Sequence, residues 1–162
     1  MLRPALTRRL AMNTFLKTAC LAALLTASAL VPAHARAQTA SVTVTVEDVR
    51  DGGLMDIALY DSEAGWDGTG PVASRRIEIE NGVAIAVFEN LEAGEYAVRL
   101  YHDENGDDVF NMNVMGIPTE GYGFSNNPFP RFRGARHDEA EFTVADGESV
   151  SQTIELMGGG YW

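Results

Sequence analysis

From Ser41 onward, apolar and polar residues alternate in short runs. The first run covers residues 41–47, where valines alternate with threonines and a glutamate. Further alternating runs lie at residues 55–59, 77–79, 83–87, 96–100, 140–144 and 150–156. A period of two with one polar face is typical of half-buried antiparallel strands, and these runs are not interrupted by long stretches of helical periodicity. The pattern predicts an all-β fold: an antiparallel two-sheet sandwich of about seven strands, immunoglobulin-like or prealbumin-like.

The connection between two of these runs is a hairpin at Asn81-Gly82. A two-residue turn there would place Glu80 opposite Val83, and so would put carboxylates on the apolar face of the ladder. A three-residue loop of residues 80–82, with its glycine in the left-handed region, places Ile79 opposite Val83 instead and keeps that face apolar. The hydrophobic pattern therefore favours the three-residue loop. In that register the apolar face of the next strand is formed by Val83, Ile85 and Val87.

The N-terminal segment has the pattern of a secretory signal. Four basic residues precede an apolar run at residues 19–31, and the small-residue pattern of residues 33–37 follows. The segment 1–37 is predicted to be a signal peptide cleaved after Ala35 or Ala37. Met12 starts a shorter version of the same signal, so the start codon is either Met1 or Met12. The apolar run is shorter than the ~20 residues that a membrane span needs, and the mature chain is predicted to have no transmembrane span.

Export would leave a single β-sandwich domain, residues 38–162, in the periplasm or on the outer surface of the cell. From Arg36 onward the chain has eight arginines, no lysine and twenty-three acidic residues, a formal balance of 8 − 23 = −15. This charge argues against binding to nucleic acid or to anionic membranes. The one cysteine, Cys20, lies in the predicted signal. The mature domain therefore cannot use disulfides and depends on its core.

Between Tyr101 and Glu139 lie about 37 residues without clear periodicity. A segment of this length in a compact domain is usually functional or disordered. Because this one is rich in aromatic residues and glycine, it is predicted to be one long ordered loop.

The first part of the loop has the spacing of a calcium site. Short oxygen-bearing side chains alternate there, as calcium coordination by a curved loop requires. The candidate ligands are Asp103, Asn105, Asp107, the carbonyl of Val109, Asn111 and, from further along, Glu120. Two residues depart from an EF-hand loop: Asp108 replaces a glycine and Val114 replaces a bidentate glutamate. The alternative is a solvated acidic turn without a metal, so calcium is a hypothesis at this stage.

The second part of the loop places aromatic residues among glycines and prolines. Such residues form either a platform for a ligand or a cap over the open end of the sandwich. The candidate ligand-binding residues are Tyr122, Phe124, Asn126, Phe129 and Phe132. Three arginines close by are expected to pair with the acidic loop; they are Arg131, Arg133 and Arg136.

Three strings of residues carry a family resemblance. They are Leu-x-x-Gly-x-Tyr-Ala at 91–97, His-Asp-Glu-Asn-Gly at 102–106, and Gly-Ile-Pro-x-Glu-Gly-Tyr-Gly-Phe-Ser-Asn-Asn at 116–127. With them the chain resembles the exported bacterial family catalogued as domain of unknown function 2141. In that family the acidic loop usually continues as Asn-Gly-x-Leu-Asp, whereas residues 107–111 here read Asp-Asp-Val-Phe-Asn. The resemblance implies a small exported β-sandwich and implies no particular activity.

Three functional hypotheses follow. In the first, the protein is an exported binding module whose acidic loop is ordered by calcium and whose partner is an envelope protein, a peptide or a glycan. In the second, it is a structural or assembly component of the envelope without a metal. The third, a metal-dependent hydrolase, lacks a recognisable catalytic constellation, and the protein is predicted not to be an enzyme. His102, for example, falls on the inward side of its strand with Leu100 and is expected to be packed.

Overall fold

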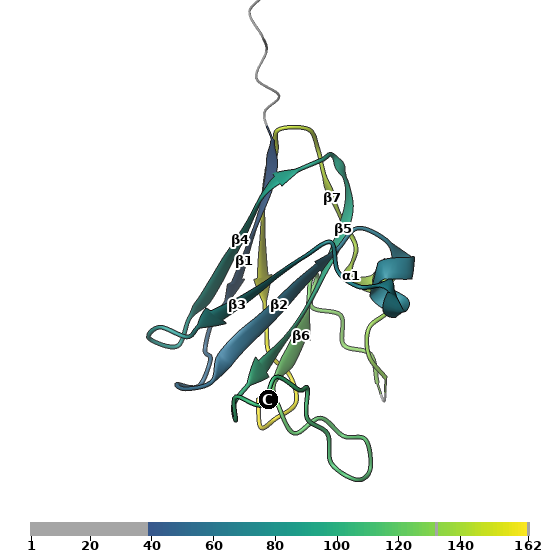
Figure 1. Cartoon of the computed structure of the whole chain (residues 1–162). Coiled ribbons are helices and arrows are strands. Elements are labelled where there is room, and N and C mark those ends of the chain that lie inside the picture. Colours follow the sequence, from purple (N-terminus) through teal and green to yellow (C-terminus); the bar gives the residue numbers. More distant parts are fainter. Residues whose placement is uncertain (1–38, 132, 162) are drawn as a thin grey trace, which may run out of the picture. The chain divides into compact units, whose positions relative to one another are not determined.

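The computed structural model describes residues 39–131 and 133–161, so the predicted signal peptide and its cleavage site lie outside the described residues. The described chain forms two sheets, one with the strand order β4-β1-β8 and one with the order β3-β2-β5-β6, in which β7 also pairs with β5 (Figure 1). The strands are β1 (Ala40–Val46), β2 (Leu54–Tyr60), β3 (Ala73–Glu78), β4 (Ala84–Leu91), β5 (Gly94–Asp103), β6 (Tyr122–Phe124), β7 (Phe142–Val144) and β8 (Ser149–Ile154). The all-β, two-sheet prediction is confirmed, with eight strands in place of about seven.

The core lies between the two sheets and is built by the predicted alternation of β1, β2 and β5. Their inward side chains are all at most 6% exposed: Val42, Val44, Val46, Met55, Ile57, Leu59, Tyr96, Val98 and Leu100. One pairing departs from the antiparallel prediction. β8 runs parallel to β1, with Ser41 opposite Ser149 and Val46 opposite Ile154.

The hairpin prediction at residues 80–82 is wrong. Glu80 and Val83 pair directly, with N–H···O distances of 3.0 and 3.1 Å. Asn81 and Gly82 have φ angles of 54° and 77°, which are the angles of a two-residue type I′ turn. The buried side of β4 is consequently Ala84, Ala86 and Phe88.

The predicted apolar face of β4 points outward, with Ile85 57% exposed and Val87 43% exposed. The prediction failed because it treated β3 and β4 as one continuous ladder. β3 belongs to the five-stranded sheet and β4 to the three-stranded sheet, where it pairs with β1. The two strands therefore separate after the turn, and each turns its own apolar side toward the core.

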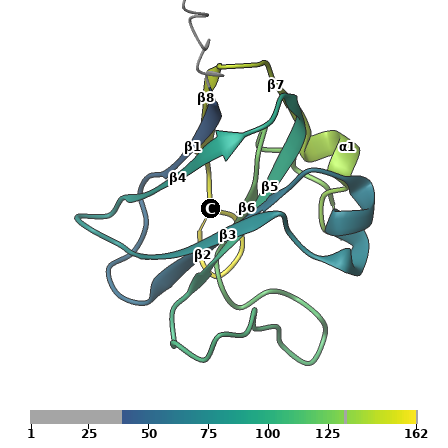
Figure 2. The same cartoon turned by 45° about the horizontal axis from the view of Figure 1, so that its top comes forward.

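Two short helical segments cover one side of the five-stranded sheet: η1 (Gly65–Thr69) and α1 (His137–Ala140). They lie side by side in both views (Figures 1 and 2), and the Trp66 and His137 rings meet edge to face at 5.9 Å. The alternation at 140–144 predicted a strand from Ala140, but that residue ends α1 and the strand begins at Phe142. Within the described residues, no helix is long and apolar enough to cross a membrane.

His102 is packed, as predicted from its inward position on β5, and is 1% exposed. Its Nε2 lies 2.7 Å from the carbonyl of Gly52, so this nitrogen must donate. Its Nδ1 lies 2.8 Å from the Tyr161 hydroxyl, within hydrogen-bond distance. The ring therefore joins β5 to the β1–β2 turn and to the C-terminal segment.

The Gly-Phe-Ser-Asn-Asn string is a structural joint. β6 and β7 pair with the same edge of β5, at different places along it. Between them, Ser125 Oγ accepts the N–H of Val98 at 2.8 Å and donates to the carbonyl of Ala140 at 2.5 Å. The amides of Asn126 and Asn127 donate to the carbonyls of Glu141 at 2.7 Å and Thr153 at 3.0 Å. The string thus joins β6 to β5, to the segment between α1 and β7, and to β8.

Replacing Ser125 by alanine should therefore lower the free energy of unfolding by about 1–3 kcal/mol, because the buried N–H of Val98 loses the Oγ acceptor. Urea unfolding followed by circular dichroism measures this difference. The control is Ser151→Ala on the exposed side of β8, which should change stability by less than about 0.5 kcal/mol. Equal stabilities of the two variants would contradict the role of Ser125 as a joint.

Candidate functional site

The outer face of the five-stranded sheet is the floor of the candidate site. Alternate residues of a strand share a face, and the register aligns the outward residues of four strands in two rows. One row contains Ser74, Ala58, Arg99 and Phe124, and the next contains Arg76, Asp56, Tyr101 and Tyr122. The side chain of Ala58 is small, so the floor is lowest in the first row.

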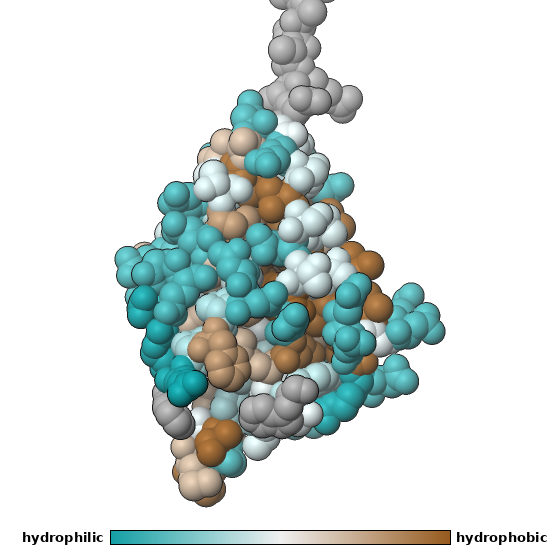
Figure 3. All heavy atoms as spheres, turned by 180° about the vertical axis from the view of Figure 1, so that it is seen from behind, coloured by the Kyte–Doolittle hydropathy of each residue, from teal (hydrophilic) through white to brown (hydrophobic). Residues whose placement is uncertain are grey.

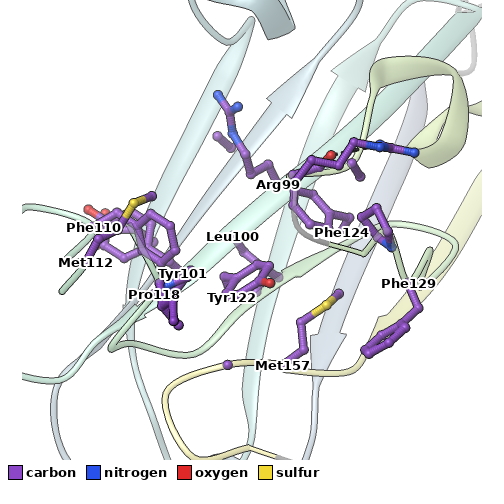
Figure 4. Close-up of a pocket in the computed structure, with 18 of the residues that line it drawn as sticks. Arg99, Leu100, Tyr101, Phe110, Met112, Pro118, Tyr122, Phe124, Phe129 and Met157 are labelled. Carbon is purple, nitrogen blue, oxygen red and sulfur yellow. Dashed lines mark hydrogen bonds between the residues drawn. The ribbon is translucent and has the colours of Figure 1, made fainter. Parts of the chain in front are cut away.

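Two loop segments rise beside this floor and enclose a groove. One wall comes from residues 110–118 and the other from residues 129–131 and 133–135, and the groove has a volume of about 1240 Å³. Figure 4 shows Phe110, Met112 and Pro118 on one side, Phe129 on the other, and Tyr122 with Met157 between them. Ligand sites in proteins typically have volumes of about 300–1,000 Å³ and are mostly apolar. The groove is thus large enough for a small organic ligand.

Aromatic rings line the groove in a continuous series. Tyr101 and Phe110 have ring centroids 5.5 Å apart, Phe110 and Tyr122 are 5.7 Å apart, and Tyr122 and Phe124 are 5.8 Å apart. Tilted and edge-to-face pairs at this spacing are favourable. Burial, reinforced by the nearby Asp56 and Asp103, raises the pKa of Tyr101 to about 12, so its hydroxyl stays protonated at neutral pH.

The rim of the groove exposes large apolar side chains. Phe129 is 72% exposed and Met115 is 76% exposed, and the side chain of Val114 at the loop tip is fully open. Apolar atoms accordingly cover the tip at the lower end of the molecule in Figure 3. Contiguous exposed apolar surface on a soluble domain usually marks a binding site.

Arg99 is the central charged group of the groove floor. Its Nη2 donates to the Tyr60 hydroxyl at 2.6 Å. Its guanidinium carbon lies 4.9 Å from the centroid of the Tyr60 ring and 5.0 Å from that of Trp66. One hydrogen bond and contacts with two aromatic rings restrict the position of the guanidinium, so this cation is held in place on a mostly apolar surface.

Next to the groove, the acidic loop is organised around a buried carboxylate. Asp103 is 0% exposed. Its Oδ1 accepts the N–H groups of Gly106 at 2.7 Å and Asp107 at 3.2 Å. Its Oδ2 accepts the N–H of Asp108 at 3.0 Å and Nη2 of Arg76 at 2.5 Å. Both oxygens of Asp103 are therefore engaged within the protein, and Arg76 supplies the compensating positive charge.

The remaining predicted calcium ligands bond to one another. Asn105 Nδ2 donates to Asp107 Oδ2 at 3.0 Å and to Asn111 Oδ1 at 2.7 Å. Asp107 Oδ1 accepts the N–H of Val109 at 3.0 Å. Glu120 is 4% exposed, and its Oε2 accepts the N–H of Asn111 at 2.9 Å. Within residues 39–131 and 133–161, there is no group of three or more His, Cys, Asp or Glu side chains that could hold a metal ion.

Acid should weaken the stabilising effect of Asp103. Burial alone would raise its pKa, but the N–H groups of Asp108, Gly106 and Asp107 and the Arg76 guanidinium lower it below the ordinary value of 3.8. The unfolded chain then binds the proton more tightly, so the stabilisation is complete above about pH 4 and is lost as the pH falls through the lower folded pKa. Burial raises the pKa of Asp56, so its titration acts in the opposite direction.

The gap in unfolding free energy between the wild type and Asp103→Asn isolates this effect from the other carboxyl groups. That gap should narrow as the pH falls from about 5 to about 3. Urea unfolding at each pH measures it, and a gap independent of pH would show that the Asp103 charge does not stabilise the fold.

Residues 42–152 match a family described as uncharacterised proteins conserved in bacteria, DUF2141. The chain belongs to this family. The resemblance predicted from the sequence is thereby confirmed, and the matched range runs from β1 into β8 and includes both walls of the groove. No match was found among curated proteins or among solved structures.

In this DUF2141 domain, only some of the predicted ligand-binding residues lie in the groove. Tyr122, Phe124 and Phe129 line the groove. The first two belong to strand β6 and not to a loop or a cap over the end of the sandwich. Asn126 does not line the groove, because its amide is bonded to the joint described above. Phe132 lies outside the described residues.

The arginines after the aromatic segment do not pair with the acidic loop, contrary to prediction. Arg133 forms a two-point ion pair with Glu139 at 2.6 and 2.7 Å, and Arg136 pairs with Asp138 at 3.0 Å. Both partners belong to α1, six and two residues away in the sequence, where a short helix brings them within reach.

Sequence reasoning also missed part of the groove: Ala58, Arg99, Met112 and Met157. The alternation in the sequence already places Arg99 and Ala58 at outward positions of predicted strands. The sequence does not show the β2–β5 register that puts the two residues side by side.

The calcium site stays a prediction, and thermal unfolding tests it. A site of about 0.1 mM affinity would add ~1.4 kcal/mol at ~1 mM calcium, which would raise the Tm of this DUF2141 domain by a few degrees above its value in magnesium. Asp107→Asn should abolish that rise. It leaves Asp103 and its hydrogen bonds in place, so it is a gentler change than one at the buried carboxylate. Equal Tm values in the two cations would leave a hydrogen-bonded turn without a metal.

Proposed function

We propose that this protein is a binding module that holds the apolar part of a ligand in the groove between residues 110–118 on one side and residues 129–131 and 133–135 on the other. The observation that carries the proposal is the apolar lining, which lies on the outer face of the sheet and not in the core between the sheets. With the export predicted from the N-terminal segment, this binding would take place in the periplasm or at the cell surface.

The composition of the lining supports a ligand-binding site over a surface without a binding role. Met112, Met115 and Met157 line the groove together with the aromatic series. Methionine is flexible and polarizable, and it adapts to differently shaped apolar ligands. Met112 and Met115 are 54% and 76% exposed. An apolar ligand in the groove would therefore bury apolar surface that is solvent-exposed in the domain alone.

Filling the groove tests the proposal. Ala58→Phe would place a ring on the floor between Ser74 and Arg99. The control is Thr45→Phe, which adds the same ring to the outward side of β1 in the other sheet. The probe is N-phenyl-1-naphthylamine, an uncharged dye that fluoresces when it leaves water, and the protein is taken as purified after export.

The wild type and Thr45→Phe should bind the dye with the same saturable affinity, and Ala58→Phe should bind it about tenfold more weakly or not at all. Circular dichroism checks that each variant is folded. Absence of saturable binding to the wild type would overturn the proposal, as would equal binding to all three proteins.

A further inference from the structure

The charges of the groove are the reverse of those of the surrounding domain. The chain has 23 acidic residues, but Asp56 is the only acidic residue among the described residues that line the groove. Three arginines line it: Arg99, Arg131 and Arg133. An apolar surface that gathers cations in an acidic protein is complementary to a ligand with an apolar body and an anionic group.

Within the part of the chain that the structure describes, two of these arginines have no carboxylate partner. Arg133 is neutralised by its two-point pair with Glu139. For Arg99 and Arg131, no carboxylate of residues 39–131 and 133–161 lies within 4 Å. Asp56 shares Arg76 with Asp103 and Asp108 and lies 3.5 Å from it. Among the described residues that line the groove, three arginines therefore face one carboxylate.

The orientation of Arg99 suits recognition of a carboxylate. A guanidinium has five N–H donors, and within the described residues the side chain of Arg99 uses one, to Tyr60. Contacts with the Tyr60 and Trp66 rings restrict the guanidinium, so little conformational entropy is lost when a second group binds. A planar fork fixed in this way binds a carboxylate with two parallel hydrogen bonds.

Resting on the proposed function, we infer that the natural ligand is a free anionic amphiphile: a single apolar chain or ring system that ends in a carboxylate. Its apolar body lies along Phe110, Met112 and Tyr122, and its carboxylate binds Arg99, with Arg131 adding a second positive charge. A free molecule fits better than a lipid in a bilayer, because the groove volume suits one small ligand.

Matched charged and neutral probes test the inference. The charged probe is 11-(dansylamino)undecanoic acid, and the neutral probe is its methyl ester. The variants are Arg99→Gln, Arg131→Gln and the double variant, and the control is Arg75→Gln, an exposed arginine on β3 that does not line the groove. Binding of the neutral probe also reports whether each variant still has a folded groove.

The wild type should bind the acid about tenfold more tightly than the ester, and added salt should weaken only the acid. Arg99→Gln should remove most of this preference while changing ester affinity less than about twofold, and the double variant should remove all of it. Arg75→Gln should behave as the wild type. Arg99→Lys, which keeps the charge without the fork, should retain part of the preference.

The failure of this inference differs from failure of the proposed function. Equal binding of acid and ester, unchanged by Arg99→Gln, would overturn the anionic ligand and leave an apolar site. If the wild type bound neither the acid nor the ester, the proposed binding site itself would be wrong. Sedimentation with phosphatidylglycerol vesicles without binding of the free acid would overturn the inference in favour of a bilayer, and binding of neither but of an unfolded apolar peptide would overturn it in favour of a protein partner.

Discussion

Asp103→Ala is expected to lower the free energy of unfolding by about 3–5 kcal/mol, the largest loss from any single carboxylate in the domain. The Asp103 side chain is fully buried, and it accepts three backbone N–H groups and one guanidinium bond. Its removal leaves the N–H groups without their acceptor and Arg76 without its buried partner, which is the costly way to break an ion pair.

The consequence should be visible in thermal unfolding. Domains of this size are stable by about 5–15 kcal/mol, so the variant would lose a large share of its stability and its Tm would fall by about 10 °C or more. Near-ultraviolet circular dichroism follows the transition. The matched control is Asp108→Asn, which removes another carboxylate that pairs with Arg76 but is 75% exposed. Asparagine also tolerates the φ of 64° at this position, so the variant should cost no more than about 1 kcal/mol. Similar losses in both variants would mean that the negative charge of the loop, and not the hydrogen bonds of the buried Asp103 carboxylate, stabilises the fold.

The acidic loop was found from the sequence as a candidate metal site, and its structural role was not. Spacing identified the residues, because Asp103, Asn105 and Asp107 alternate along a short stretch. Spacing does not say which side of the loop meets the body of the protein. Arg76 comes from β3, 27 residues earlier, and reaches Asp103 only because β3, β2 and β5 are neighbours in one sheet.

The same limit explains which strands were predicted. β1, β2 and β5 have several alternating residues each, and their inward sides were identified correctly. β6 has three residues, two of them flanking Gly123, so it has no pattern to detect. That glycine is required by the packing, because a Cβ there would lie 2.6 Å from Ile154 Cγ2. β4 was assigned the wrong face because a change of sheet at the hairpin leaves no trace in the alternation.

The groove was predicted only through some of its aromatic residues. Tyr122, Phe124 and Phe129 are clustered in the sequence, and clustering is detectable. The floor includes Ala58, Arg99 and Phe124, from three strands whose alignment is fixed by pairing far along the chain. A binding surface that depends on register is therefore less accessible to sequence reasoning than one that depends on a loop.

Trp66→Ala is expected to cost about 3–5 kcal/mol of unfolding free energy, the usual loss for a buried large aromatic residue. Trp66 is 6% exposed, donates from Nε1 to the carbonyl of Ala135 at 3.2 Å, and packs edge to face on Tyr60 at 5.2 Å. It belongs to a second apolar cluster outside the main core. The loss should appear in urea unfolding as a lower midpoint with an unchanged slope.

Phe129→Ala is the matched control, since it removes an aromatic ring that is 72% exposed and should alter stability by less than about 0.5 kcal/mol. The two variants should also differ in binding. Because Arg99 stacks on Trp66, Trp66→Ala frees the guanidinium and should reduce the preference for the charged probe over the neutral one. Phe129→Ala should weaken both probes equally, because that ring contacts the apolar body of either. If Trp66→Ala left the charge preference intact, the stacked ring would stabilise the fold without orienting Arg99, and carboxylate binding would not depend on a fixed guanidinium plane.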